Sequence, residues 1–280
     1  MAFKAPSLSF LPICFETTTF VYDTLAGRLR ELAYLNKGLR ISLEDTRAGQ
    51  ERKDSFCYEG GIIQFVEYVN SLKHANLIHE NVIYMKAEKG DITAEVALQY
   101  NDTYTESIIT FANNMATVDG GTHDVGFKNA LTKVTNQYAR KLGFLKDADK
   151  NLSGEDAREG ICAIVSVKLP DAQFESQTKA KLGNTSIGTL VRNIVNDKLY
   201  QYLEEHPNEA KIVIEKAIAA SNAREAAQKA RDASRNKEVV RKAAVAHANY
   251  KVPKEELKHP LKKIVGVIRK KLYQDDDTKK

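Results

Sequence analysis

The side chains best suited to chemistry in this 280-residue chain follow its most apolar segment. Residues 160–169 are predominantly apolar, as in a strand at the centre of a sheet. Gln177 and Lys179 then present an amide and an ammonium group within one short loop. Two hydrogen-bond donors delivered by a rigid strand suit an anion such as a phosphate. A solvated turn is the alternative, and Lys181 is a second candidate for the same role.

A second group of residues, Gly120, Gly121, Thr122 and His123, precedes a segment of helical periodicity. Adjacent glycines predict a sharp turn into that helix, whose first amide groups could bind an anion. We favour the alternative of a structural packing turn, with Thr122 as the helix cap.

The pattern of apolar residues predicts an α+β fold in which helices pack against a mixed sheet. Strands are predicted at residues 17–21, 39–45, 56–58, 82–86, 92–100, 106–112 and 160–169. Helices are predicted at 23–38, after Gly61, after Gly121 and at 186–205. Turn signals at 88–91 and 101–102 predict two successive hairpins, so that the three strands between 82 and 112 would be neighbours.

The C-terminal part of the chain differs from the rest in composition and charge. Residues 209–249 contain neither Pro nor Gly and are rich in Ala, which predicts one helix of about 40 residues, roughly 60 Å long. From Glu209 onwards 19 basic residues face 10 acidic ones, although the whole chain carries a net charge of only +5. A basic arm on a mildly acidic body favours a polyanionic partner or a solvated helix face. An amphipathic segment at 261–272 is expected to pack weakly, if at all, on the body.

Several classes of protein are disfavoured by the composition. No run of about 18 uncharged apolar residues occurs, so no membrane span is expected. Prolines interrupt the apolar N-terminus and no secretory cleavage signal is evident, which favours the cytoplasm. The cysteines, which are expected to be reduced and buried, are Cys14, Cys57 and Cys162. Asp149, Glu155 and Asp156 are interpreted as solvated acids, and no metal site is predicted.

Four motifs occur in a recognisable order: residues 28–38, residues 59–62 (EGGI), residues 119–127 (DGGTHDVGF) and residues 177–179 (QTK). Together they resemble the transducer domain of the ATPase subunit of bacterial type IIA DNA topoisomerases, over roughly residues 15–237. The gyrase B type is most similar, and the topoisomerase IV type is a close second. The resemblance implies a ribosomal protein S5 domain 2-like fold followed by a long exit helix.

The resemblance also implies roles for individual residues. Lys179 would be the catalytic lysine of a switch loop that contacts the γ-phosphate of ATP, with Gln177 as a second donor. Lys128 would face the cavity that holds double-stranded DNA, unless it is an ordinary surface lysine. Apart from the resemblance, the position of Arg158 and Glu159 just before the central strand leads us to expect that they tie the switch loop to the body through charge-assisted hydrogen bonds.

The implied cofactors and partners belong to a larger enzyme. ATP and Mg²⁺ would act in the complete enzyme, with neither bound tightly by this chain alone. Partners would be an ATPase domain of the same subunit type, a gyrase A-type subunit and double-stranded DNA, without a membrane. No segment resembles the ATP-binding or Toprim domains of the family, so we expect a catalytically inactive fragment.

The predicted domain organisation has four parts. A lead-in at 1–16 precedes a transducer domain at 17–206, an exit helix at 207–249 and a basic tail at 250–280. Two other functions remain open at this point: a stand-alone nucleic-acid-binding protein and a protein-interaction module that docks through its long helix.

Overall fold

A computed structural model of the chain describes residues 20–249, with side chains as far as Lys242. The chain divides into two units, one ending at Asn222 and one beginning at Ala223. The elements before Asn222 are α1 (Tyr22–Leu35), β1 (Ile41–Asp45), β2 (Arg52–Phe56), α2 (Ile62–Leu72), β3 (Ile83–Lys89), β4 (Ile92–Tyr100), β5 (Ser107–Ala112), β6 (Met115–Ala116), α3 (Thr122–Lys141), α4 (Gly154–Arg158), β7 (Ile161–Lys168), α5 (Thr185–Ile194), a π-helical turn (Val195–Leu199) and α6 (Tyr200–Glu205). Helix α7 (Pro207–Asn249) begins in the first unit.

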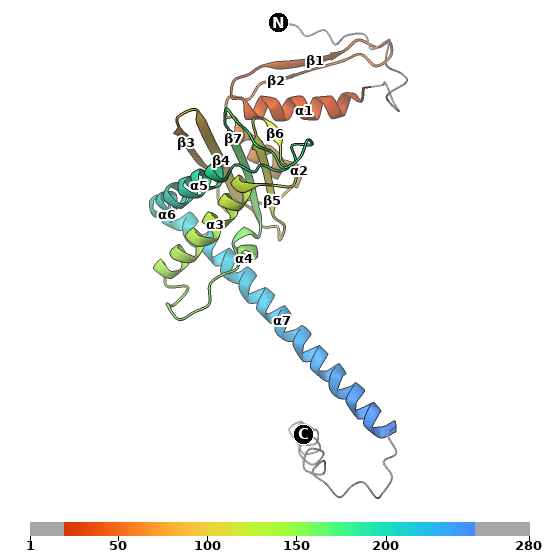
Figure 1. Ribbon diagram of the computed structural model, residues 1–280, viewed down its shortest axis with the longest axis vertical. Helices are drawn as coiled ribbons and strands as arrows, with labels where there is room; N and C mark the ends of the chain where they lie inside the picture. The colour runs from red at the N-terminus through yellow and green to blue at the C-terminus, as the bar shows by residue number, and fades with distance from the viewer. Residues whose placement is uncertain (1–19, 250–280) are drawn as a thin grey trace, which may run out of the picture. The chain divides into compact units, whose positions relative to one another are not determined.

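The first unit is organised around a five-stranded mixed sheet of order β3-β4-β7-β5-β6 (Figure 1). Strand β7 lies at its centre, antiparallel to β4 and parallel to β5. Successive side chains of a strand point to opposite faces, and β7 is apolar on both. Val165 and Val167 join the core on one face, whereas Cys162 and Ile164 join the core on the other. The central strand predicted at 160–169 is confirmed.

Helices cover both faces of this sheet. Helix α2 packs on β4 and β7, and the end of α1 joins its core. On the opposite face the apolar side chains of α3, α5, α6 and the first turns of α7 form the larger core. Helix α1 lies alongside the separate β1–β2 hairpin (Figure 1). The predicted α+β class, with helices on a mixed sheet, is therefore confirmed.

Of the two successive hairpins predicted between residues 82 and 112, the first is confirmed and the second is wrong. Strands β3 and β4 do form the expected hairpin, with Lys89 opposite Ile92. Strands β4 and β5 are not neighbours, because β7 lies between them. The chain does reverse direction after residues 101–102, but β4 and β5 do not pair with each other. The Asn101 amide donates instead to the carbonyl of Gly160, which precedes β7. A strand that is apolar on both faces must be covered on both, which favours a central position for β7. Its pairing with β4 on one edge and with β5 on the other leaves no place for a β4–β5 hairpin.

Smaller differences concern the ends of elements. The strand predicted at 56–58 runs instead over Arg52–Phe56, paired with β1. Thr17, Thr18 and Thr19 of the strand predicted at 17–21 lie outside the described residues, and Phe20 and Val21 form no strand. The helix predicted at 186–205 is interrupted by the π-helical turn. Cys162 is buried as expected, whereas Cys57 is half-buried; Cys14 is not among the described residues.

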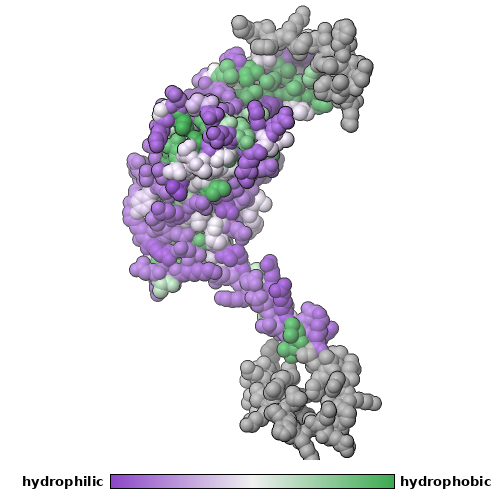
Figure 2. Space-filling model, viewed as in Figure 1, coloured by the Kyte–Doolittle hydropathy of each residue, from purple (hydrophilic) through white to green (hydrophobic). Residues whose placement is uncertain are grey.

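The surface of the first unit is mainly hydrophilic on the face shown in Figure 2, and apolar side chains gather over α1. No helix among residues 20–249 is long and apolar enough to cross a membrane.

In the second unit α7 continues as far as Asn249. Before the boundary its buried residues include Val213, Ile214 and Ala217. Every residue from 222 to 242 is exposed. The segment predicted at 261–272 lies outside the described residues.

Candidate functional site

The loop that carries Gln177 and Lys179 connects β7 to α5, and its base is closed by backbone hydrogen bonds. Phe174 and Leu182 form an antiparallel bridge. The Glu175 amide donates to the Lys181 carbonyl at 3.0 Å, and the Gly183 amide donates to the Gln173 carbonyl at 2.8 Å. The two sides of the loop are therefore held together, and residues 176–180 form its tip.

Residues 176–179 of the tip are exposed and include both predicted phosphate ligands, whereas Ala180 is buried. Lys179 has a left-handed backbone conformation, with φ at +57°. Its amide donates to the Ser176 carbonyl at 3.0 Å, which closes a tight turn. Within residues 20–249 the side chains of Gln177 and Lys179 make no hydrogen bond or ion pair. The tip thus presents an ammonium and an amide group whose donors are free for an anion.

Lys181, the second candidate, is already paired. Its ammonium nitrogen lies 3.0 Å from a carboxylate oxygen of Glu175. This ion pair crosses the base of the loop, next to the backbone bond between the same two residues. The geometry therefore favours Lys179 over Lys181 as the lysine free to reach a ligand.

The base of the loop is joined to the Gly120-Gly121-Thr122-His123 turn, so that two motifs distant in sequence form one structure. The Leu182 amide donates to the Gly120 carbonyl at 3.2 Å, and the Thr122 amide donates to the Leu182 carbonyl at 3.0 Å. A third bond joins the same two segments: the Asp119 amide donates to the Ala180 carbonyl at 3.0 Å. We call these three bonds the loop clamp.

Glycine is required at the centre of the loop clamp. Gly121 has φ at +141°, and a Cβ there would lie 2.5 Å from the Leu182 carbonyl oxygen. Helices α3 and α5 cross equally closely, since a Cβ at Gly126 would lie 2.3 Å from the Gly188 carbonyl oxygen. These close approaches hold α3, the turn and the loop in a fixed arrangement.

One expectation for the turn needs correction. Thr122 is not the cap, because Gly121 occupies the cap position and no side chain caps the helix. The Thr122 hydroxyl donates instead to the Asn184 carbonyl at 2.7 Å, which ties α3 to the start of α5. The Thr122 amide is also used in the loop clamp. The interpretation of the turn as a packing element fits this geometry better than an anion site.

His123 is fully buried and unavailable to an external ligand. Its Nε2 atom lies 3.1 Å from the Thr117 hydroxyl. Burial lowers the pKa of His123 to about 4, because the charged form would lose its hydration. A neutral imidazole is therefore part of the core beneath the turn.

Lys128 lies one helical turn after Asp124, and its ammonium nitrogen is 3.0 Å from Oδ2 of that carboxylate. Both residues line a hollow of about 260 Å³ beside Asp119 and Gly120. Lys128 is thus a partly exposed cation with an intramolecular partner, adjacent to the loop clamp.

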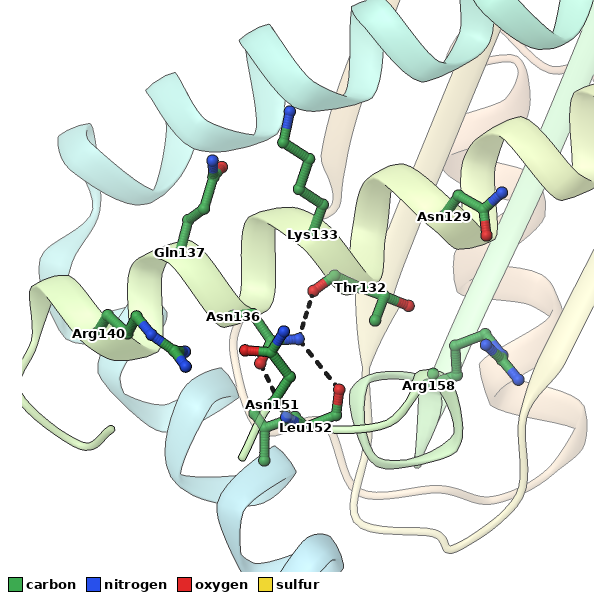
Figure 3. Close-up of a pocket in the computed structure, with 10 residues that line it drawn as sticks. Asn129, Thr132, Lys133, Asn136, Gln137, Arg140, Asn151, Leu152 and Arg158 are labelled. Carbon is green, nitrogen blue, oxygen red and sulfur yellow. Dashed lines mark hydrogen bonds between the residues drawn. The ribbon is translucent and has the colours of Figure 1, made fainter. Parts of the chain in front are cut away.

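A larger polar hollow of about 690 Å³ lies along α3, and sequence reasoning missed it (Figure 3). Lys133, Arg140 and Arg158 contribute three basic side chains to its wall. Asn136 forms its floor through hydrogen bonds to the Leu152 amide and carbonyl. The spacing of Lys133 and Arg140 on one helix was the available signal, but Arg158 joins them only through the tertiary fold.

The expected link from Arg158 to the switch loop is wrong. Arg158 Nε donates to Glu106 Oε2 at 2.6 Å, so this arginine binds the connection between β4 and β5. Asp156 belongs to a capping box with Ser153, in which each side chain accepts the amide hydrogen of the other. Among the side chains described, residues 20–242, no group of three or more His, Cys, Asp or Glu is placed to hold a metal ion.

This mixed sheet, with its covering helices and long C-terminal helix, has the ribosomal protein S5 domain 2-like α+β fold. A gyrase B ATPase-domain structure from Thermus thermophilus, in complex with an aminocoumarin, matches 78% of this chain and 58% of that one, with 38% identity and a TM-score of 0.68. The gyrase B structure from Myxococcus xanthus matches 71% of this chain and 55% of that one, with 25% identity and a TM-score of 0.61.

The sequence comparisons agree with the structural ones. The family model for DNA gyrase B matches residues 61–233. The DNA gyrase B protein of Clostridium acetobutylicum is 52% identical over 218 residues, which are 78% of this chain and 34% of that protein. The corresponding protein of Halalkalibacterium halodurans is also 52% identical, over 76% of this chain and 33% of its own length. The chain belongs to the DNA gyrase B family, and it spans about a third of the length of these two relatives.

Proposed function

We propose that this chain is the transducer part of a gyrase B-type, ATP-hydrolysing DNA topoisomerase, and that Lys179 contacts the γ-phosphate of ATP. One observation carries the proposal: Lys179 has no partner among the side chains that the structure describes, and it lies at the exposed tip of a loop whose base is clamped to the body. In the complete enzyme an ATPase domain would supply the remaining nucleotide contacts and Mg²⁺, and a gyrase A-type subunit would complete the assembly. The transducer domain would comprise residues 17–206, with 207–249 as the exit helix.

The chemistry of the donor set supports this assignment. Lys179 is a compact point charge on a flexible stem, suited to stabilising the negative charge that develops on a transferring phosphoryl group. Gln177 adds a neutral donor from the same tip. Together they offer donors and no acidic group, which fits a phosphate and not a metal ion. Nucleotide binding and Mg²⁺ coordination therefore depend on residues outside this loop.

The experiment uses a complete gyrase B-type subunit that carries this segment, assembled with its partner subunit. Lys179→Ala should lower kcat for ATP hydrolysis about 100-fold or more, because one phosphate contact of the transition state is lost. Lys181→Ala is the matched control, since that lysine is paired with Glu175, and its kcat should change less than about threefold. Normal turnover of the Lys179→Ala enzyme would contradict the switch-lysine assignment.

The 280-residue chain by itself is proposed to be inactive and to bind ATP weakly. A single lysine and an amide supply a small part of a nucleotide site, whereas tight sites bury most of their ligand. Calorimetry with Mg²⁺-ATP should give no saturable heat below about 1 mM, which corresponds to roughly 4 kcal/mol of binding energy. Micromolar binding would show that the chain contains a nucleotide site of its own.

DNA is the proposed polyanionic partner, with Lys128 among the contacting residues. A lysine ammonium binds backbone phosphates without reading sequence, so binding should weaken steeply with salt. The polar hollow along α3 provides further basic side chains in Lys133, Arg140 and Arg158. This hollow also favours the second candidate function, a stand-alone nucleic-acid-binding protein. DNA affinity without any effect of Lys179→Ala on a reconstituted enzyme would support that second function.

A further inference from the structure

The carboxylate of Asp124 lies between Lys128 and the turn at Gly120. Its Oδ2 atom accepts a hydrogen bond from Lys128 at 3.0 Å. The same oxygen lies against Gly120, where a Cβ atom would be only 2.8 Å from it. Asp124 therefore contacts both a proposed DNA ligand and the turn that contains the loop clamp.

The ion pair between Asp124 and Lys128 is partly buried. Only 14% of the Asp124 side chain is exposed, against 30% for Lys128. Its second oxygen, Oδ1, is buried and has no hydrogen-bond partner within residues 20–249. Lys128 is the cation paired with this carboxylate, and the N-terminus of α3 adds a weaker favourable field. Removing one member of a partly buried pair leaves the other charge poorly solvated, which is unfavourable.

Gly120 lies between Asp124 and the hydrogen bonds of the loop clamp. Its carbonyl accepts the Leu182 amide, and the preceding residue, Asp119, donates to the Ala180 carbonyl. Ala180 immediately follows Lys179. A carboxylate that must move to regain water would displace Gly120, and the hydrogen bonds of the loop clamp would then open more often.

We infer that Asp124 is a positioning residue whose charge balance with Lys128 sets how firmly the loop clamp holds the Lys179 loop. When Lys128 turns to another anion, Asp124 loses its partner and the clamp loosens. The link to DNA and ATP rests on the function proposed above, whereas the coupling between Asp124 and the clamp does not. Asp124 touches neither ligand in this scheme and acts through Gly120.

The test is hydrogen exchange in the 280-residue chain, measured at the clamp amides of Asp119, Thr122 and Leu182. Lys128→Met removes the ammonium and keeps most of the stem, so exchange at these amides should accelerate about tenfold. The double variant Lys128→Met, Asp124→Asn removes both charges and should return exchange to within about twofold of the parent. A structural effect of the methionine alone would persist in the double variant and would overturn the inference.

Lys133→Met is the matched control, because this exposed lysine lies on the same helix and makes no ion pair in the described structure. It should leave exchange at the clamp amides unchanged. Equal acceleration by Lys133→Met and Lys128→Met would show a general effect of charge on α3 and would also overturn the inference. Thermal unfolding of the parent and of each variant verifies that all remain folded at the temperature of the exchange experiment.

A second arm adds a DNA duplex of about 20 base pairs at low salt. The parent chain should then show the same accelerated clamp exchange as Lys128→Met without DNA, and Asp124→Asn should show no acceleration. If Lys128→Met loosens the clamp but the duplex does not, the DNA role of Lys128 fails and the positioning role of Asp124 stands. If Lys128→Met has no effect without DNA, the positioning role fails whatever the duplex does.

Discussion

The base and the tip of the loop between β7 and α5 differ in burial and in hydrogen bonding. At the base, Leu182 is fully buried and both of its backbone groups are bonded to the glycine turn. At the tip, Gln177 and Lys179 are exposed, and their side chains have no partner in the described structure. The buried residues at the base hold the loop in place, and the exposed residues at the tip are available to a ligand.

This difference separates stability from function within a few residues. A change at the base should be measured as a loss of folding free energy. A change at the tip should leave folding unaffected and alter only the proposed reaction. Each prediction below tests that separation.

The largest effect is expected from Leu182→Ala. The side chain is fully buried in the larger core, and removing it leaves a cavity that costs about 2–5 kcal/mol. Urea unfolding of the 280-residue chain measures the loss. Thr178→Ala at the exposed tip is the control and should change stability by less than about 0.5 kcal/mol. Comparable losses for the two variants would remove the distinction between base and tip.

The buried histidine beneath the turn should make stability depend on pH. Burial lowers the pKa of His123 to about 4 in the folded state, from an ordinary value of 6.5. Well above pH 6.5 the histidine is neutral in both the folded and the unfolded state, so its protonation does not reduce the free energy of unfolding. As the pH falls from 6.5 to 4, the unfolded state binds a proton that the folded state excludes, so up to about 3 kcal/mol is lost.

Unfolding curves at several pH values between about 7.5 and about 4.5 measure this loss. His79 contributes in the same direction, because burial also lowers its pKa. His123→Asn should flatten the pH dependence, whereas His74→Asn at an exposed position should not. An unchanged slope in the His123→Asn protein would assign the pH dependence to other groups.

Gly121→Ala should cost somewhat less, about 2 kcal/mol. The backbone conformation, with φ at +141°, is strained for any residue with a Cβ, and that atom would meet the Leu182 carbonyl oxygen. Gly143→Ala provides a reference, because this glycine also has a positive φ, at +76°, but no atom lies within 4 Å of its added Cβ. The difference between the two variants measures the close approach to the loop together with the greater backbone strain at Gly121.

The sequence predicted the parts of the fold that depend on local pattern. The apolar strand at 160–169, the first hairpin and the breaker-free helix up to Asn249 each follow from residue types within one segment. The neighbour of β5 could not be predicted in this way, since a turn signal at 101–102 says nothing about which strand lies alongside. Strand order depends on pairing between segments far apart in the sequence, here β5 with β7, and that is a property of the whole sheet.

The candidate site shows the same division. Lys179 and the glycine turn were identified from the sequence, but their connection through Leu182 was not, because backbone hydrogen bonds leave no signature in residue type. Asp124 was missed for a different reason. A carboxylate four residues before a lysine on a helix is a common surface pair, and only the fold shows that its oxygen also packs against Gly120.

The smallest effect on stability is expected from Lys181→Ala, at the exposed ion pair that crosses the base of the loop. Glu175 and Lys181 form an ion pair at 3.0 Å, with about half of each side chain exposed. Water and salt screen such pairs, so Lys181→Ala should lower stability by no more than about 0.5 kcal/mol. The backbone hydrogen bond from Glu175 to Lys181 survives the substitution, and it keeps the two sides of the loop together.

Unfolding of Lys181→Ala and of the parent at low and at high salt tests this expectation: the small difference in stability between them should vanish in about 1 M salt. A loss above about 1.5 kcal/mol that persists at high salt would show that the ion pair, and not the backbone and Leu182, fixes the base of the loop.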